Sequence, residues 1–252
     1  MSDLGLAAVT FLATLGAALI ATVVRTLLPP THMSHESQDI VRLGMGLVAS
    51  MTALLLGLVT AAAKGSFDAQ DAGMRSAAAG IVTLDRHLAR YGPEAAPIRE
   101  SLRGAVATRI EAIWPASGAG RGFGSLDGPA PAEKIEDQIL ALAPANDTQR
   151  WFKSEALGLC EQVLRTRTTM IGNAAGSVPL PFLMVVIFWL MMTFASFGLY
   201  APRNATVVAV LVIASISVAA AVYLILELDD PFTGVIRISS GPMRSALAAL
   251  GH

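Results

Sequence analysis

Residues Leu43–Ala63 read LGMGLVASMTALLLGLVTAAA, an apolar stretch without a charged side chain. A helix needs roughly 20 apolar residues to cross the hydrocarbon core of a bilayer, so this stretch predicts a transmembrane helix. Three other stretches share its length and its lack of internal charge, and they are Leu4–Val24, Leu180–Tyr200 and Ala205–Leu226. Because a charge buried in a bilayer is costly, its absence from all four stretches supports the assignment. The sequence therefore predicts an all-α membrane protein whose four transmembrane helices form two hairpins.

The composition of the chain agrees with this assignment and excludes several classes of protein. Charged residues make up 15% of the sequence, against about 25% in an ordinary soluble domain. The formal net charge is -1, so no strong electrostatic field favours nucleic acid as a partner. The single cysteine, Cys160, excludes an internal disulfide. We expect Cys160 to be a small core residue, with a reactive thiol as the alternative.

The first apolar stretch differs from a cleaved secretory signal. A signal peptide begins with a cationic segment, whereas Asp3 precedes this stretch. The stretch is also long for a signal, and no small-residue cleavage pattern follows it before Arg25. We therefore expect a retained span.

Basic residues near the span ends predict the orientation of the chain. Four spans put the N-terminus, the region between spans two and three, and the C-terminus on one side of the membrane. That side carries Lys64, Arg75, Arg165, Arg167, Arg237 and Arg244, whereas the other side carries Arg25, Arg42 and Arg203. The positive-inside rule then places both termini and the intervening region in the cytoplasm, with the spans in the inner (cell) membrane. The expected segments are a first hairpin at 1–63, a cytoplasmic helical region at 64–177, a second hairpin at 178–228 and a cytoplasmic tail at 229–252.

Span two is expected to continue into the cytoplasm as one long helix. Apolar residues recur after it at nearly helical spacing, at Phe67, Met74, Ala78, Ile81, Leu84 and Leu88. Gly65 is the only potential helix breaker between this series and the span. Gly92-Pro93 ends the helix, because glycine suits a helix C-terminus and proline suits the start of the next helix.

The rest of the region between spans two and three also has helical periodicity. A second helix is expected to end at about Trp114, a short helix to cover Ala132–Ala143, and a long helix to begin at Asn146 with Gln149 completing a capping box. Ser117–Pro131 is rich in glycine and proline and predicts a mobile loop. We expect these helices to pack on each other and on neighbouring subunits.

No residue pattern in the sequence indicates catalysis. We find no nucleotide-binding loop, no cluster of metal ligands and no nucleophile–base pair. We therefore expect a protein that is not an enzyme and has no cofactor. His32 and His35 could share a helical turn, but only Glu36 and Asp39 lie near enough in sequence to add ligands. A solvated outer loop is the favoured interpretation of this segment, and a metal site is the alternative.

Span two carries small residues on one face. Intervals of four and three residues separate Gly46, Ser50, Ala53, Gly57, Thr60 and Lys64, whereas Leu47, Met51, Leu54, Leu55 and Leu58 occupy much of the remaining surface. The simpler interpretation is a seam that lets another helix approach closely. The alternative is a pore-lining face around an oligomer axis, because small and hydroxyl-bearing residues leave room for water. Copies of Lys64 would then form a basic ring at the inner mouth, and a basic ring favours anions.

The end of span four is acidic. Glu227, Asp229 and Asp230 lie close together at the expected inner boundary of the membrane, and a proline follows them. Because the residue before a proline avoids the helical region, the chain must turn here. The simplest interpretation is a helix stop whose acids are solvated or paired with Arg237 or Arg244. Cation coordination, with Ca²⁺ as the candidate, and an intersubunit salt bridge are the alternatives.

Three stretches together resemble one protein family. Residues 39–49 read DIVRLGMGLVA, residues 194–206 read FASFGLYAPRNAT, and residues 226–240 read LELDDPFTGVIRISS. These stretches resemble the bestrophin-like domain family of bacterial membrane proteins. Because they are spread along the chain, the resemblance covers nearly its whole length. That family is kin to the bestrophins, which are pentameric anion channels with four spans per subunit and both termini in the cytoplasm. In bestrophins the second span lines the pore, and a helical cytoplasmic body lies between spans two and three.

The resemblance implies a homo-oligomer, a pentamer by analogy, that conducts small anions such as chloride passively through a lipid bilayer. The chain departs from bestrophins in two ways. Bestrophins constrict the pore with bulky apolar residues on the second span, whereas small residues occupy that position here. Their calcium clasp also uses a longer acidic run than Glu227, Asp229 and Asp230. The alternative function is a non-conducting membrane scaffold or sensor that signals through its cytoplasmic helices.

Overall fold

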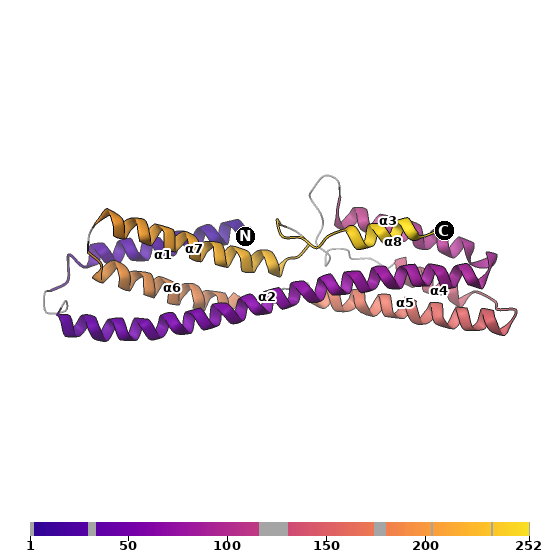
Figure 1. Ribbon diagram of the computed structural model, residues 1–252, viewed down its shortest axis with the longest axis horizontal. Coiled ribbons are helices and arrows are strands. Elements are labelled where there is room, and N and C mark those ends of the chain that lie inside the picture. The colour runs from indigo at the N-terminus through magenta and orange to yellow at the C-terminus, as the bar shows by residue number, and fades with distance from the viewer. Residues whose placement is uncertain are drawn as a thin grey trace. The chain divides into compact units, whose positions relative to one another are not determined.

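The computed structural model describes residues 3–29, 34–115, 131–173, 180–202, 204–232 and 234–251. Within these ranges the ordered elements are α-helices and one short 3-10 helix, Pro93–Ala95, with no strand. Figure 1 shows the helices in chain order, and their bounds are α1 Asp3–Val24, α2 His35–Tyr91, α3 Ala96–Ile113, α4 Pro131–Leu140, α5 Asp147–Asn173, α6 Leu180–Tyr200, α7 Ala205–Asp229 and α8 Gly241–Ala249. The all-α class predicted from the sequence is confirmed.

Within the part of the chain that the structure describes, four helices are long and apolar enough to cross a membrane, which confirms the four predicted spans. They are α1, α2, α6 and α7. The bounds of α6 coincide with the predicted span, and α7 continues past the predicted end to Asp229. Helix α2 runs well beyond its apolar part, to Tyr91. The predicted mobile loop lies outside the described residues, apart from Pro131.

The chain divides into two compact units, which we call the first unit and the second unit. The first unit comprises Met1–Gly65 and Ser177–Asp229, and the second comprises Ser66–Gly176 and Asp230–His252. The two apolar hairpins therefore belong to one unit. The polar region between them shares the other unit with the C-terminal tail.

In the first unit, α1 packs against α6 and α7 through small residues. Ala18 of α1 has no exposed surface, and it forms a buried cluster with Phe194 of α6 and Leu211 of α7. Opposite Ala18 lies Gly198, where an added Cβ would overlap the carbonyl group of Ala18. A glycine is thus required for the backbones of α1 and α6 to approach this closely.

Polar groups on α1 bond to the end of α6 beside this contact. The Thr22 hydroxyl lies 3.1 Å from the carbonyl oxygen of Gly198 and donates to it. Just past the end of α1, Arg25 Nη1 donates to the carbonyl oxygen of Ala201, the residue after α6, at 2.6 Å. Because the last carbonyls of a helix have no partner within the helix, these side chains satisfy groups that an apolar environment would leave unpaired.

The second unit is built around one hydrophobic core. The second half of α2, together with α3, α4, α5 and α8, supplies it, and its buried members include Leu88, Ile98, Leu102, Ile113, Ile139, Cys160 and Leu250. Helices α2 and α5 meet at two glycines: a Cβ at Gly73 would lie 3.3 Å from Met170, and a Cβ at Gly80 would lie 3.3 Å from Val163. Burial of Cys160 confirms the prediction of a core thiol, and its pKa is raised to about 11, first by burial and then by the charge of Glu136.

A buried ion pair joins α2, α3 and the C-terminal end of the chain. Asp85 is buried, with 2% of the residue exposed. Its carboxylate accepts hydrogen bonds from Arg99 Nε at 2.7 Å and from Arg99 Nη2 at 2.9 Å. The amide of Gly251 donates to the same carboxylate at 3.3 Å. Bidentate pairing and a third donor compensate Asp85 for its loss of water.

The C-terminal tail belongs to the core of the second unit. Met243, Ala246 and Leu250 on and after α8 are buried in it. Trp114 Nε1, at the end of α3, donates to the carbonyl oxygen of Ile238 at 3.0 Å. The tail therefore packs on the helices that lie between spans two and three in the sequence.

The turn between α2 and α3 and the start of α5 contact each other. Helix α2 ends before Gly92, whose φ of 136° favours glycine. At the start of α5, the Asn146 side chain accepts from the Gln149 amide at 2.8 Å, as expected for an N-cap, while Gln149 Oε1 accepts from the Ala145 amide at 2.7 Å. Gln149 Nε2 also donates to the carbonyl oxygen of Tyr91 at 3.0 Å, which fixes the end of α2.

Candidate functional site

The membrane part of α2 has three distinct faces. The first face is buried and contains Thr52, Val59 and Ala63. At about 3.6 residues per turn, the neighbours of Thr52 in sequence, Met51 and Ala53, point to opposite sides of this face. They mark the two remaining faces, and both of these are exposed in a single subunit.

The small-residue face consists of Gly46, Ser50, Ala53, Gly57 and Thr60, followed by Lys64 at its end. All are exposed except Thr60, which is half-buried. Positions 46 and 57 face open space, because no atom lies within 4 Å of where a Cβ would be. The Ser50 hydroxyl donates to the Gly46 carbonyl at 2.9 Å, and the Thr60 hydroxyl donates to the Leu56 carbonyl at 2.7 Å. Both hydroxyls retain lone pairs that can accept hydrogen bonds from water.

The large-residue face lies on the other side of α2. It carries exposed leucines and one methionine, and its members are Leu43, Leu47, Met51, Leu54 and Leu58. Leu54 is 68% exposed, so nothing in its own subunit covers it. In a membrane protein such a face must be covered either by lipid or by another subunit.

The first turns of the small-residue face border a groove within the first unit. A groove of about 720 Å³ separates α2 from α6 and α7, and Gly46 lies on its wall together with Arg42 and Thr193. Gly46 therefore adjoins both the groove and the exposed surface of α2, whereas Ser50, Ala53 and Gly57 do not line the groove.

The three acidic residues after span four differ in their exposure. Glu227 is 4% exposed, Asp229 is half-buried and Asp230 is exposed. Glu227 accepts a hydrogen bond from the Tyr223 side chain, one turn earlier in α7. Among the residues that the structure describes, no group of three or more His, Cys, Asp or Glu side chains could hold a metal ion. His35 begins α2, and His32 lies outside the described residues.

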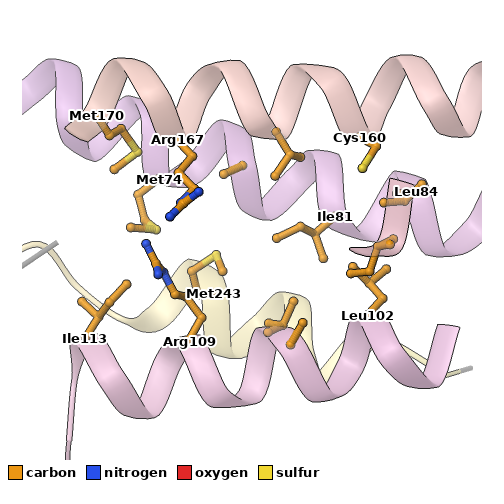
Figure 2. A pocket seen from close by; sticks show the side chains of 15 residues that line it. Met74, Ile81, Leu84, Leu102, Arg109, Ile113, Cys160, Arg167, Met170 and Met243 are labelled. Atoms are coloured by element: carbon orange, nitrogen blue, oxygen red, sulfur yellow. The ribbon is translucent and has the colours of Figure 1, made fainter. Parts of the chain in front are cut away.

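Sequence reasoning missed a cationic cavity in the second unit. Arg109 of α3 and Arg167 of α5 line a cavity whose wall is otherwise apolar (Figure 2). Their positions carried a signal, because each arginine lies at helical spacing within an apolar series. Arg109 is three residues after Val106, and Arg167 is three residues before Met170. A charged residue on the apolar face of a helix points into the core rather than into water.

Comparison with known proteins identifies one family and one fold. The family model of the Bestrophin-like domain matches residues 12–243. A tryptophan-to-alanine mutant of a bacterial bestrophin homolog from Klebsiella pneumoniae has a similar structure, with a TM-score of 0.70 at 15% identity over 99% of this chain and 97% of that chain. A leucine-to-threonine mutant of a Klebsiella pneumoniae bestrophin homolog gives a TM-score of 0.66 at 16% identity over 97% of each chain. At these identities the likeness shows a shared fold. No curated protein matches the chain.

Proposed function

The chain belongs to the bestrophin-like domain family, and from this premise we propose that it forms an oligomeric membrane channel for small anions, chloride among them, with α2 lining the pore. The observation that carries the proposal is the division of α2 into three faces, of which only one is covered by its own subunit. Membership of the bestrophin-like family supports a channel as the class of function. The exposed faces of α2 support this helix as the wall of the ion path.

A closed ring of subunits would give each face of α2 a role. The buried face holds the helix on its own subunit. The large-residue face suits a neighbouring subunit or lipid, because burial of its leucines away from water is energetically favourable. The small-residue face suits the axis, because glycine, alanine and hydroxyl side chains leave a lumen wide enough for water and offer it acceptors.

The end of the small-residue face supplies a charge for anion preference. Lys64 is exposed and lies one turn beyond Thr60. Symmetry would repeat it around the axis, and a ring of like positive charges raises the local concentration of anions. The ring would concentrate anions at the mouth without binding them tightly, since water screens a wide entrance.

The test compares two bulky substitutions at the same depth of α2. Purified full-length protein is reconstituted in vesicles, and chloride efflux is measured for the parent, Ala53→Phe and Met51→Phe. Because Ala53 and Met51 point to opposite sides of the buried face, we expect Ala53→Phe to reduce efflux strongly and Met51→Phe to leave it near the parent rate. Equal effects of the two substitutions would refute α2 as the pore-lining helix.

The same vesicles distinguish the channel from a non-conducting scaffold or sensor. An intact oligomer that passes no anion under a chloride gradient or an applied voltage supports the scaffold. A dimer with the small-residue face buried between subunits would do the same, because that face would then be a packing seam.

A further inference from the structure

The second unit contains a cavity that the proposed channel does not use. It has a volume of about 120 Å³ and lies among α2, α3, α4, α5 and α8 (Figure 2). Most of its wall is apolar, and its lining includes Met74, Ile81, Leu84, Leu102, Ile113 and Met243. For comparison, a dry apolar cavity of about 150 Å³ binds benzene. The space therefore suits an apolar group of about six carbon atoms.

The two arginines lie at one end of this cavity. In Figure 2 the side chains of Arg109 and Arg167 extend from facing helices toward one another, whereas Leu84, Leu102 and Cys160 line the other end. The cavity is thus amphipathic, with a cationic end and an apolar end.

The surroundings of the two guanidinium groups favour an anion between them. Burial, and then the charge of Arg167, lower the pKa of Arg109 to about 10, so Arg109 still carries its charge at neutral pH. Arg167 Nε is buried, and within the described residues it has no hydrogen-bond acceptor. Both side chains are half-buried, so the two like charges repel each other and are only partly solvated, and a shared anion would relieve both costs.

We propose that this cavity binds an amphipathic monoanion, namely a carboxylate with a short apolar tail. The carboxylate would accept hydrogen bonds from Arg109 and Arg167, because the planar guanidinium matches a carboxylate in geometry. The tail would extend toward Ile81 and Leu102. Chloride alone would leave the apolar end empty, and the flexible methionines in the wall can adapt to tails of different shape. The inference does not depend on the proposed channel, since every lining residue belongs to the second unit.

The first experiment separates the head from the tail of the ligand. Binding of hexanoate, acetate and hexanol to the full-length protein in detergent is measured by isothermal titration calorimetry, at constant chloride concentration and ionic strength. Hexanoate should bind at least about tenfold more tightly than either acetate or hexanol, a ratio equivalent to about 1.4 kcal/mol. Equal binding of hexanoate and acetate, or no binding of hexanoate, would overturn the proposal.

The second experiment uses matched variants. Arg167→Gln should weaken hexanoate binding roughly 10- to 100-fold, in keeping with a charged hydrogen bond. Arg165→Gln removes the same charge from α5 at an exposed residue that pairs with Glu161, and it should leave the affinity unchanged. Ala77→Leu keeps both arginines but fills the cavity, so hexanoate should bind more weakly to it than to the parent. If Arg167→Gln and Arg165→Gln have the same effect, or if Ala77→Leu binds hexanoate like the parent, the cavity is not the site.

Discussion

Gly198 of α6 lies directly against the backbone of Ala18 in α1, so closely that a single added carbon at Gly198 would overlap the Ala18 carbonyl. Gly57 of α2, by contrast, faces open space in the subunit. Contacts within the chain therefore exclude a larger residue at position 198. At position 57, only a contact from outside the chain could exclude one.

Gly198→Ala should destabilise the subunit itself. The added Cβ forces α1 and α6 apart, and overpacking of this kind costs typically about 1–3 kcal/mol. Thermal unfolding of the detergent-solubilised protein should show a lower midpoint for Gly198→Ala and a nearly unchanged midpoint for Gly57→Ala. An unchanged midpoint for Gly198→Ala would contradict the close contact between α1 and α6.

Gly57→Leu should leave the subunit folded but disrupt its assembly. A Cβ at this position would have no atom of another residue within 4 Å, yet the leucine would occupy the small-residue face, which we expect to lie at a seam or a pore. Light scattering after size-exclusion chromatography measures the oligomer. Gly44→Leu is the control, because Gly44 also faces open space but belongs to the opposite side of α2. If Gly57→Leu assembles and conducts like the parent, Gly57 faces lipid.

Lys64→Glu should reduce chloride flux in reconstituted vesicles and shift selectivity toward cations, because charge reversal inverts the potential at the inner mouth. The effect should weaken as salt rises, since the Debye length is about 8 Å at physiological ionic strength. The competing role is a lysine whose ammonium lies among lipid headgroups. A permeability ratio that does not change in Lys64→Glu supports that role.

A cysteine in the second unit should report the cytoplasmic side of the membrane. Ser154 is exposed on α5, and Ser154→Cys should resist a membrane-impermeant thiol reagent in intact cells and react after lysis. The native Cys160 need not be removed, because burial raises its pKa to about 11 and keeps it protonated at neutral pH. Labelling of Ser154→Cys in intact cells would reverse the predicted orientation.

Asp85→Ala should destabilise the second unit much more than removal of an exposed ion pair. Asp85 is buried and bound by both Arg99 and the amide of Gly251, so its loss leaves buried donors unpaired, at a cost of about 3–5 kcal/mol. Asp71→Ala, which removes the partner of the exposed Arg75, should cost about 0–1 kcal/mol. Chemical denaturation of the full chain measures both, and similar losses for the two variants would contradict a structural role for Asp85.

The class of the protein and most of its helices could be predicted from residues that lie close together in the chain. Apolar length predicts a span because the bilayer has a fixed thickness, and this requirement acts on each stretch alone. The same holds for the start of α5, where Asn146 and Gln149 cap the helix through groups a few residues apart. The small-residue face of α2 was also visible, because helical periodicity puts its members in line.

Which helix faces meet could not be predicted from the sequence. Gly198 and Gly57 both lie in apolar helices, yet Gly198 is enclosed by Ala18 and Gly57 is open, because the difference depends on a helix from a distant part of the chain. The pairing of Asp85 with Arg99, the burial of the C-terminal tail and the convergence of Arg109 and Arg167 on one cavity arise in the same way. Each of these contacts depends on how helices pack against one another. Periodicity gives the direction in which a side chain points from the axis of its helix, but not which residue lies opposite it.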